Sequence, residues 1–241
     1  MLNYANFDEE VFLRERRHAS RHFCDFVCSL PTPPVFSRPK VYLEPDERQF
    51  ALGYLSDCGL NWKNDCIIAI HAGSGDPQKR WFADRYRDVV RSLAEGGSKV
   101  LLLSGPSDAG IANRVHKEAA HDNVFIVSGK ALREVAAIIE RSTLFFGNDS
   151  GLMHLAAAVD TPVVALFGPS DPVVWGPTGN RNAVLIGDCS RLDWADAPCN
   201  TCTHQECLDS IKTAEVVRVI RERLRYLSKC LPGGCAGRHF A

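Results

Sequence analysis

The sequence predicts an α/β fold built on a parallel sheet with helices on both faces. From residue 66 onward, short apolar segments of strand length alternate with segments of helical periodicity. These strands are apolar throughout rather than alternating, which is typical of parallel strands buried on both faces. Polar, glycine-containing loops follow several of the strands. Because ligands of such sheets bind at the carboxyl ends of the strands, we expect the functional site where these loops gather.

Two helices and a proline-rich linker are expected before the sheet. Residues 8–28 carry apolar side chains at helical spacing on an arginine-rich background. Residues 31–45 contain five prolines, which lack the N–H that a helix needs and predict an extended linker. A second helix is expected from Pro45 to about Gly59, because proline and acidic residues suit a first helical turn.

The elements of the α/β part are read from its apolar segments. Strands are expected at 66–70, 99–103, 124–127, 144–146, 162–167 and 183–186, and helices at about 82–95, 109–120, 131–141, 151–159 and 213–227. The chain then divides into an N-terminal helix (1–30), a linker and helix (31–62), an α/β domain (63–230) and a tail (231–241).

Composition limits the classes of function. The chain has 241 residues and a formal net charge of −1, which argues against general nucleic-acid binding. It has no apolar run near the roughly 20 residues that span a bilayer, and residues 1–10 do not resemble a signal peptide. We therefore expect a cytoplasmic protein.

Ten cysteines are many for such a chain, but they form no even framework. Cys199 and Cys202 have the spacing of a zinc-binding pair, and Cys207 would be a further ligand. There is no second pair of this kind, so free thiols are favoured over a structural metal, and no cofactor is expected.

A polar loop at 71–81 follows the first strand of the sheet. Gly73 and Gly75 allow the backbone to approach an anion, while Ser74 adds a hydroxyl and Lys79 a positive charge. The spacing fits neither a Walker A loop nor a dinucleotide fingerprint, which has glycine where this chain has Gln78. Alone, the loop predicts either an anion site or a tight turn with solvated basic side chains.

A second loop, Gly147 to Gly151, joins a buried strand to a helix of small residues. Asp149 or Ser150 can cap that helix, and His154 lies within about one turn of its start. Such a corner is equally a capped helix or an anion site.

Taken together, the two loops are more informative. Two helix N-termini and a lysine can hold a diphosphate without a metal. Asp149 would then accept hydrogen bonds from sugar hydroxyls or steady its own loop. Asp108, which follows the next strand, is either a helix cap or a ligand contact.

Three segments resemble the heptosyltransferases of glycosyltransferase family 9, enzymes that add heptose to the lipopolysaccharide core. They are HAGS at 71–74 with KRW at 79–81, GNDSGLMHLAAA at 147–158, and TPVVALFGPSDP at 161–172 with WGP at 175–177. The resemblance covers about residues 66–187. It implies a GT-B fold of two domains, in which the C-terminal, Rossmann-like domain holds the nucleotide-diphospho-sugar and the N-terminal domain holds the acceptor. Residues 63–230 would then be the donor-binding domain, and residues 1–30 a helix that belongs to or packs on a missing N-terminal domain.

The resemblance also implies roles for particular residues. Ser74, Gly75 and Lys79 would contact the donor diphosphate. Asp149, Ser150, Gly151 and His154 would line the sugar and phosphate side, and Asp108 matches an acidic residue near the nucleotide. The donor would be an ADP-sugar such as ADP-heptose. The acceptor would be lipid-linked or an oligosaccharide, which places the protein at the periphery of the inner membrane.

The chain departs from the family at its N-terminus. Family members begin with a strand and a Gly-Asp loop that supplies the expected general base, whereas residues 1–30 are predicted as a helix. We therefore expect the base outside this chain, on a longer protein or a separate acceptor-domain chain. The alternative is a non-catalytic nucleotide-sugar-binding or scaffold module. A Rossmann oxidoreductase is disfavoured by the missing glycine fingerprint.

Overall fold

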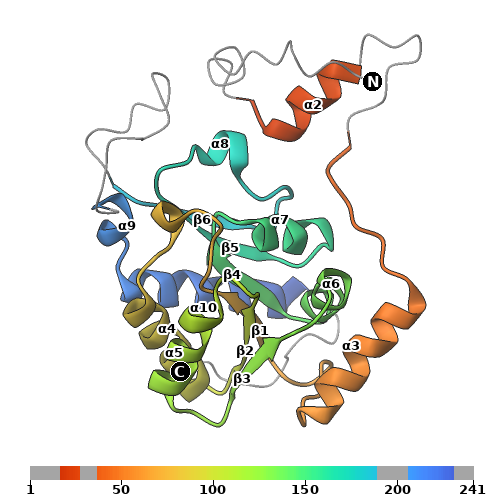
Figure 1. Cartoon of the computed structure of the whole chain (residues 1–241), viewed down its shortest axis with the longest axis vertical. Helices are drawn as coiled ribbons and strands as arrows, with labels where there is room; N and C mark the ends of the chain where they lie inside the picture. Colours follow the sequence, from red (N-terminus) through yellow and green to blue (C-terminus); the bar gives the residue numbers. More distant parts are fainter. Residues whose placement is uncertain (1–16, 28–36, 189–205, 231–241) are drawn as a thin grey trace.

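The computed structural model describes residues 17–27, 37–188 and 206–230. Within them, the centre of the molecule is a six-stranded, entirely parallel sheet with the strand order β3-β2-β1-β4-β5-β6 (Figure 1). The strands are β1 Ile67–His71, β2 Lys99–Ser104, β3 Val124–Ser128, β4 Leu144–Asn148, β5 Val163–Phe167 and β6 Ala183–Ile186. All six predicted strands are thus confirmed, and the order is that of a Rossmann-like sheet.

Helices cover both faces of the sheet, as predicted. Successive side chains of a strand point to opposite faces, so Ile68 and Ile70 of β1 enter one core while Ile67 and Ala69 enter the other. The first core is closed by α4 (Ala83–Glu95), α5 (Ala109–Ala119) and α10 (Thr213–Cys230); the second is closed by α3 (Pro45–Asp57), α6 (Leu132–Glu140) and α7 (Gly151–Ala158).

Helix α3 follows the predicted linker and belongs to the second core. It begins at Pro45, and the Glu47 carboxylate accepts a hydrogen bond from the Glu44 N–H at 2.7 Å, as in a capping box. Ala51 and Leu55 are completely buried, and α3 packs along α6 (Figure 1). The helix therefore contributes to the core of the sheet domain as well as linking it to the preceding segment.

Helix α2 (Ala19–Val27) lies within the predicted helix 8–28. Of the other residues of that prediction, Arg17 and His18 are described and are not helical, while 8–16 and 28 lie outside the described ranges. Its start contacts the sheet domain at the short helix α8 (Pro172–Trp175) (Figure 1). Ala19 packs with Val174, and the His18 ring donates a hydrogen bond from Nε2 to the carbonyl of Gly176 at 2.9 Å. The predicted tail, 231–241, is also outside the described residues.

Three short elements lie in segments that the sequence predicted as loops: the 3₁₀ turn η2 (Pro77–Lys79), α8 and α9 (Glu206–Ser210). One turn is too short to show a hydrophobic period, and side-chain caps define the starts of η2 and α8 instead. Asp76 accepts a hydrogen bond from the Gln78 N–H at 2.9 Å, and Asp171 accepts one from the Val173 N–H at 2.8 Å. No helix in the described residues has the length and apolar character needed to cross a membrane.

Candidate functional site

The strand order places the site between β1 and β4. The chain reverses its direction of progress across the sheet there, and this switch point is where α/β sheets open a crevice at their carboxyl edge. His71 at the end of β1 is in register with Gly147 of β4, so the loops that follow the two strands are neighbours. Ser74 Oγ donates a hydrogen bond to the Asp149 carbonyl at 3.3 Å, which joins the loops directly.

A cavity of about 310 Å³ lies between these two loops. Seven of the eight residues predicted from the sequence line it, together with Asp76 and Trp175: Ser74, Gly75, Lys79, Asp149, Ser150, Gly151 and His154. The eighth, Asp108, lines a larger neighbouring cavity of about 690 Å³, which shares Ser74, Ser150 and His154 with the first. The two cavities therefore form one elongated site.

Asp149 connects the loops that surround the smaller cavity. Its side chain is 6% exposed, and Oδ2 accepts hydrogen bonds from Lys79 Nζ at 2.7 Å and from Ser170 Oγ at 2.6 Å. His154 Nε2 lies 3.9 Å from the other carboxylate oxygen. The cation and the hydroxyl on Oδ2 are consistent with the predicted steadying of the loop, and the contact of Asp149 with sugar hydroxyls stays a prediction.

Asn148 was missed by the sequence reasoning, although it holds the first loop in place. It is completely buried, and its Oδ1 accepts hydrogen bonds from Trp81 N–H at 3.1 Å and Tyr86 O–H at 2.9 Å. Its Nδ2 donates to the carbonyls of Ala72 and Gly73, both at 3.1 Å. One amide thus fixes both ends of the 72–81 loop, and only the folded structure reveals this pairing.

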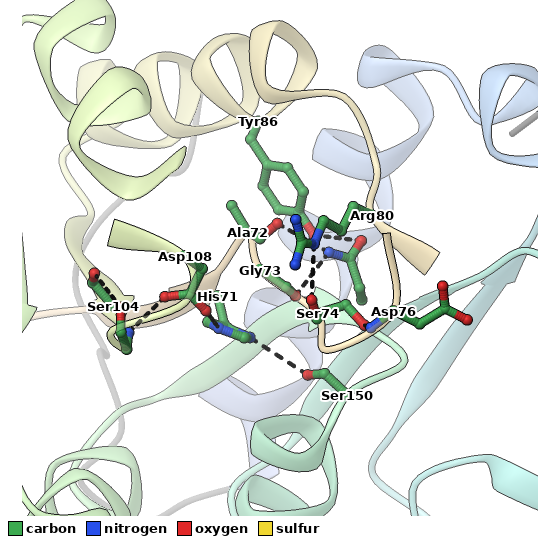
Figure 2. A network of polar contacts seen from close by, with 12 residues as sticks. His71, Ala72, Gly73, Ser74, Asp76, Arg80, Tyr86, Ser104, Asp108 and Ser150 are labelled. Carbon is green, nitrogen blue, oxygen red and sulfur yellow. Dashed lines mark hydrogen bonds and ion pairs between the residues drawn. The ribbon is translucent and has the colours of Figure 1, made fainter. Parts of the chain in front are cut away.

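Asp108 faces the end of β1 (Figure 2). It stands at the N-cap position of α5, but its carboxylate makes no cap hydrogen bond to that helix. Instead Oδ2 accepts from His71 Nε2 at 2.6 Å and Oδ1 accepts from the Gly105 N–H at 2.6 Å. Burial raises the pKa of Asp108, but these hydrogen bonds and the nearby His71 and Arg80 side chains outweigh it and hold the pKa below its usual value. Asp108 is therefore the N-cap residue of α5, as one of its two predicted roles had it, but it caps through its carbonyl and not through its side chain. Its contact with a ligand stays a prediction.

The larger cavity is mostly apolar, although Lys130, Ser104 and Ser107 also line it. Its walls include Leu103, Leu132, Val135 and Leu155, whereas the end shared with the smaller cavity is polar. The first N–H groups of α7 lie at that polar end, where a helix has no acceptors of its own for them. The arrangement suits a ligand with an anionic middle and a flat, partly apolar end.

The pH dependence of stability is expected to report on His154. Burial lowers the pKa of His154, and the charges of His18 and Lys79 lower it further, while Asp149 opposes them. As pH falls through the ordinary histidine value, the unfolded chain therefore binds a proton before the folded chain does, and stability decreases. We expect the urea midpoint to fall more steeply from pH 7.5 to 5.5 in the wild type than in His154→Gln. Equal slopes would contradict this.

A metal site would need several His, Cys, Asp or Glu side chains close together. Among residues 17–27, 37–188 and 206–230, no group of three or more His, Cys, Asp or Glu side chains is placed to hold a metal ion. Cys199 and Cys202 fall outside these ranges, so the predicted preference for free thiols is untested there. Cys207 is buried in α9, where its backbone and sulfur pack closely against Gly187 and Gly168.

The fold is a Rossmann-like α/β domain, and a crevice lined by Lys79 and by the N-terminus of α7 lies at its switch point. The family model for glycosyltransferase family 9 (heptosyltransferase) matches residues 20–205. The chain belongs to this family, and the resemblance seen in the three sequence motifs is confirmed.

Curated relatives include heptosyltransferases of several bacteria. The chain is 31% identical over 140 residues to lipopolysaccharide heptosyltransferase 3 of Escherichia coli, which covers 52% of this chain and 40% of that protein. It is 27% identical over 167 residues to lipooligosaccharide heptosyltransferase 2 of Campylobacter jejuni, covering 66% and 51% respectively. The chain thus spans about half the length, or less, of these relatives.

Solved structures of the family share the fold. A glycosyl transferase family 9 structure from Veillonella parvula aligns with a TM-score of 0.78 and 27% identity, covering 88% of this chain and 61% of that one. E. coli heptosyltransferase WaaC with ADP aligns with a TM-score of 0.57 and 22% identity over 82% of this chain and 54% of that one. The predicted GT-B type of Rossmann-like domain is therefore the observed one.

Proposed function

We propose that this chain is the donor-binding half of a heptosyltransferase-like glycosyltransferase. It binds a nucleotide-diphospho-sugar of the ADP-heptose type without a metal, for transfer of the sugar to a lipopolysaccharide-core acceptor. The proposal rests on one observation: seven of the predicted donor-binding residues line a single cavity at the switch point. Heptosyl transfer is what the names of the relatives state, and it supports the choice of sugar.

The shape of the site supports a particular placement of the donor. The diphosphate would lie where the two cavities meet, at the Ser74 hydroxyl and the N–H groups of the α7 N-terminus. The cation would come from Lys79 in the wall of the smaller cavity. The nucleoside would occupy the larger, apolar cavity. The sugar would fill the smaller cavity, against His154 and Trp175.

Lys79 can serve this site although it is paired with Asp149. An ammonium group has three N–H donors, and the hydrogen bond to Asp149 uses one of them. The remaining donors are available to phosphate oxygens. In this proposal Asp149 aims the lysine at the diphosphate, because the carboxylate itself would repel phosphate oxygens.

The acceptor side completes the proposal. The catalytic base and the acceptor site would belong to a second domain, on a longer protein or on a separate chain, and that assembly would work at the periphery of the inner membrane. The domain limits expected from the sequence, with donor binding in 63–230, are part of this proposal. The contact of α2 with α8 supports a route by which an N-terminal segment reaches the edge of the donor site.

Calorimetry with ADP, UDP and GDP tests donor binding. We expect binding of ADP with an affinity that EDTA in the buffer does not change. A metal requirement would refute metal independence alone, while binding of none of the three nucleotides would refute the proposed function. The second candidate, a non-catalytic binding module, would bind nucleotide but transfer no sugar when supplied with donor, acceptor and an acceptor-domain chain.

A further inference from the structure

We propose that His71, held in place by Asp108, is a positioning residue that fixes the Ser150 hydroxyl for binding of the nucleoside diphosphate. The inference rests on the proposed function, because it takes Ser150 as a contact of the donor. It gives His71 and Asp108 a role through Ser150, distinct from the direct contact with nucleotide that the resemblance implied for Asp108.

Asp108 fixes the orientation of the His71 ring. Their side chains are 9% and 7% exposed, and Oδ2 of the carboxylate lies 2.6 Å from His71 Nε2. The other carboxylate oxygen is held by the Gly105 N–H, so the carboxylate itself cannot rotate without losing a hydrogen bond. An ionised carboxylate can only accept, so Nε2 carries the proton and Nδ1 is the nitrogen directed toward Ser150.

Ser150 is oriented by His71 rather than by its own helix. It occupies the N-cap position of α7, where a serine hydroxyl usually accepts from an N–H of the first turn, but no such bond is made. Its Oγ lies 3.4 Å from His71 Nδ1 instead (Figure 2). This rotamer leaves the first N–H groups of α7 available to a ligand beside the hydroxyl.

Two glycines provide the space for this arrangement. A Cβ on Gly73 would lie 2.2 Å from Asp108 Oδ2, a distance that forces the carboxylate to move. A Cβ on Gly147 would lie 2.8 Å from the His71 carbonyl oxygen. The series of contacts from Asp108 through His71 to Ser150 therefore depends on the absence of a side chain at Gly73 and at Gly147.

A double-mutant cycle tests whether His71 acts through Ser150. His71→Gln can still donate to Asp108 from its amide, whose position matches Nε2, but it lacks the Nδ1 contact. We expect His71→Gln to weaken ADP binding about 3- to 10-fold in the wild-type background, since a free hydroxyl must be ordered on binding. In the Ser150→Ala background the same substitution should change ADP affinity less than about 2-fold. Equal losses in both backgrounds, or no loss in the wild type, would overturn the inference.

Thermal unfolding and two further variants, His71→Asn and Asp108→Asn, distinguish a loss of stability from a loss of ADP binding. His71→Asn retains an acceptor near the Nδ1 position but leaves Asp108 without its partner. It should therefore lose more thermal stability than His71→Gln does, whereas its loss of ADP affinity should be smaller. If His71→Gln does not fold, Asp108→Asn is measured in the same two backgrounds, with the same dependence on Ser150 expected. Wild-type protein that binds no nucleotide would refute the proposed function and this inference together; additive losses in protein that binds ADP would overturn only the inference.

Discussion

Lys79→Ala is expected to weaken ADP binding by about 1.5–3 kcal/mol, which is roughly 10- to 150-fold. The loss corresponds to one charge-assisted hydrogen bond to the diphosphate. The structure adds that Lys79 Nζ is also the cation beside the buried Asp149 carboxylate, 2.7 Å from Oδ2. Removing it leaves that carboxylate with Ser170 and the more distant His154, so we expect the free energy of unfolding to fall by about 1–3 kcal/mol as well. Calorimetry and urea unfolding measure the two effects.

A second substitution separates the two roles of Lys79. Asp149→Asn added to Lys79→Ala replaces the stranded carboxylate by a neutral amide, which should recover stability but not ADP affinity. Lys117→Ala is the matched control, because it removes an exposed lysine on α5 without touching either cavity. Unchanged affinity in Lys79→Ala would remove Lys79 from the donor site. Affinity restored in the double variant would mean that Lys79 acts only through Asp149.

Asn148→Leu is expected to destabilise the fold by at least about 3 kcal/mol. The apolar side chain would leave two donors and two acceptors without partners: the Trp81 N–H, the Tyr86 O–H and the carbonyls of Ala72 and Gly73. An unpaired buried polar group costs about 1–3 kcal/mol, and relaxation of the 72–81 loop will recover part of the sum. Urea unfolding measures the change.

ADP binding should weaken in Asn148→Leu even under conditions where the variant is folded, because the loop carries Ser74 and Lys79. Asn123→Ala is the control, since its side chain is only half-buried and its Oδ1 pairs with Lys99 far from the cavities. That control should lose no more than about 1 kcal/mol. Equal losses in the two variants would show that Asn148 is an ordinary polar residue rather than the anchor of the loop.

Much of the fold follows from the sequence because its signals are local. Continuous apolar runs identified all six strands, and helical periodicity identified α3 to α7 and α10. Proline and acidic residues located the start of α3. The one-turn elements η2, α8 and α9 escaped because their boundaries depend on single capping contacts and on packing, which leave no periodic pattern.

The sequence also predicted the candidate site, as two separate polar loops that each follow a strand. The family resemblance joined these corners to a donor ligand, and the strand order gave the physical reason: β1 and β4 are neighbours at the switch point. The sequence left open the role of each site residue whose partner is distant in the chain. For Asp149 and Asp108, the sequence offered two uses each, since it does not indicate which cation or imidazole faces a carboxylate.

The sequence by itself determined that this protein is a parallel α/β chain of the heptosyltransferase family with polar, glycine-containing loops after two of its strands. Only the tertiary structure decided which groups meet there. Lys79 pairs with Asp149, and Asn148 accepts a hydrogen bond from the backbone N–H of Trp81. Asp108 is connected to Ser150 through His71. The physical reason is that backbone periodicity is encoded within a few residues. Hydrogen bonds across the site, by contrast, join residues 37 to 79 positions apart, and packing of the whole sheet brings them together.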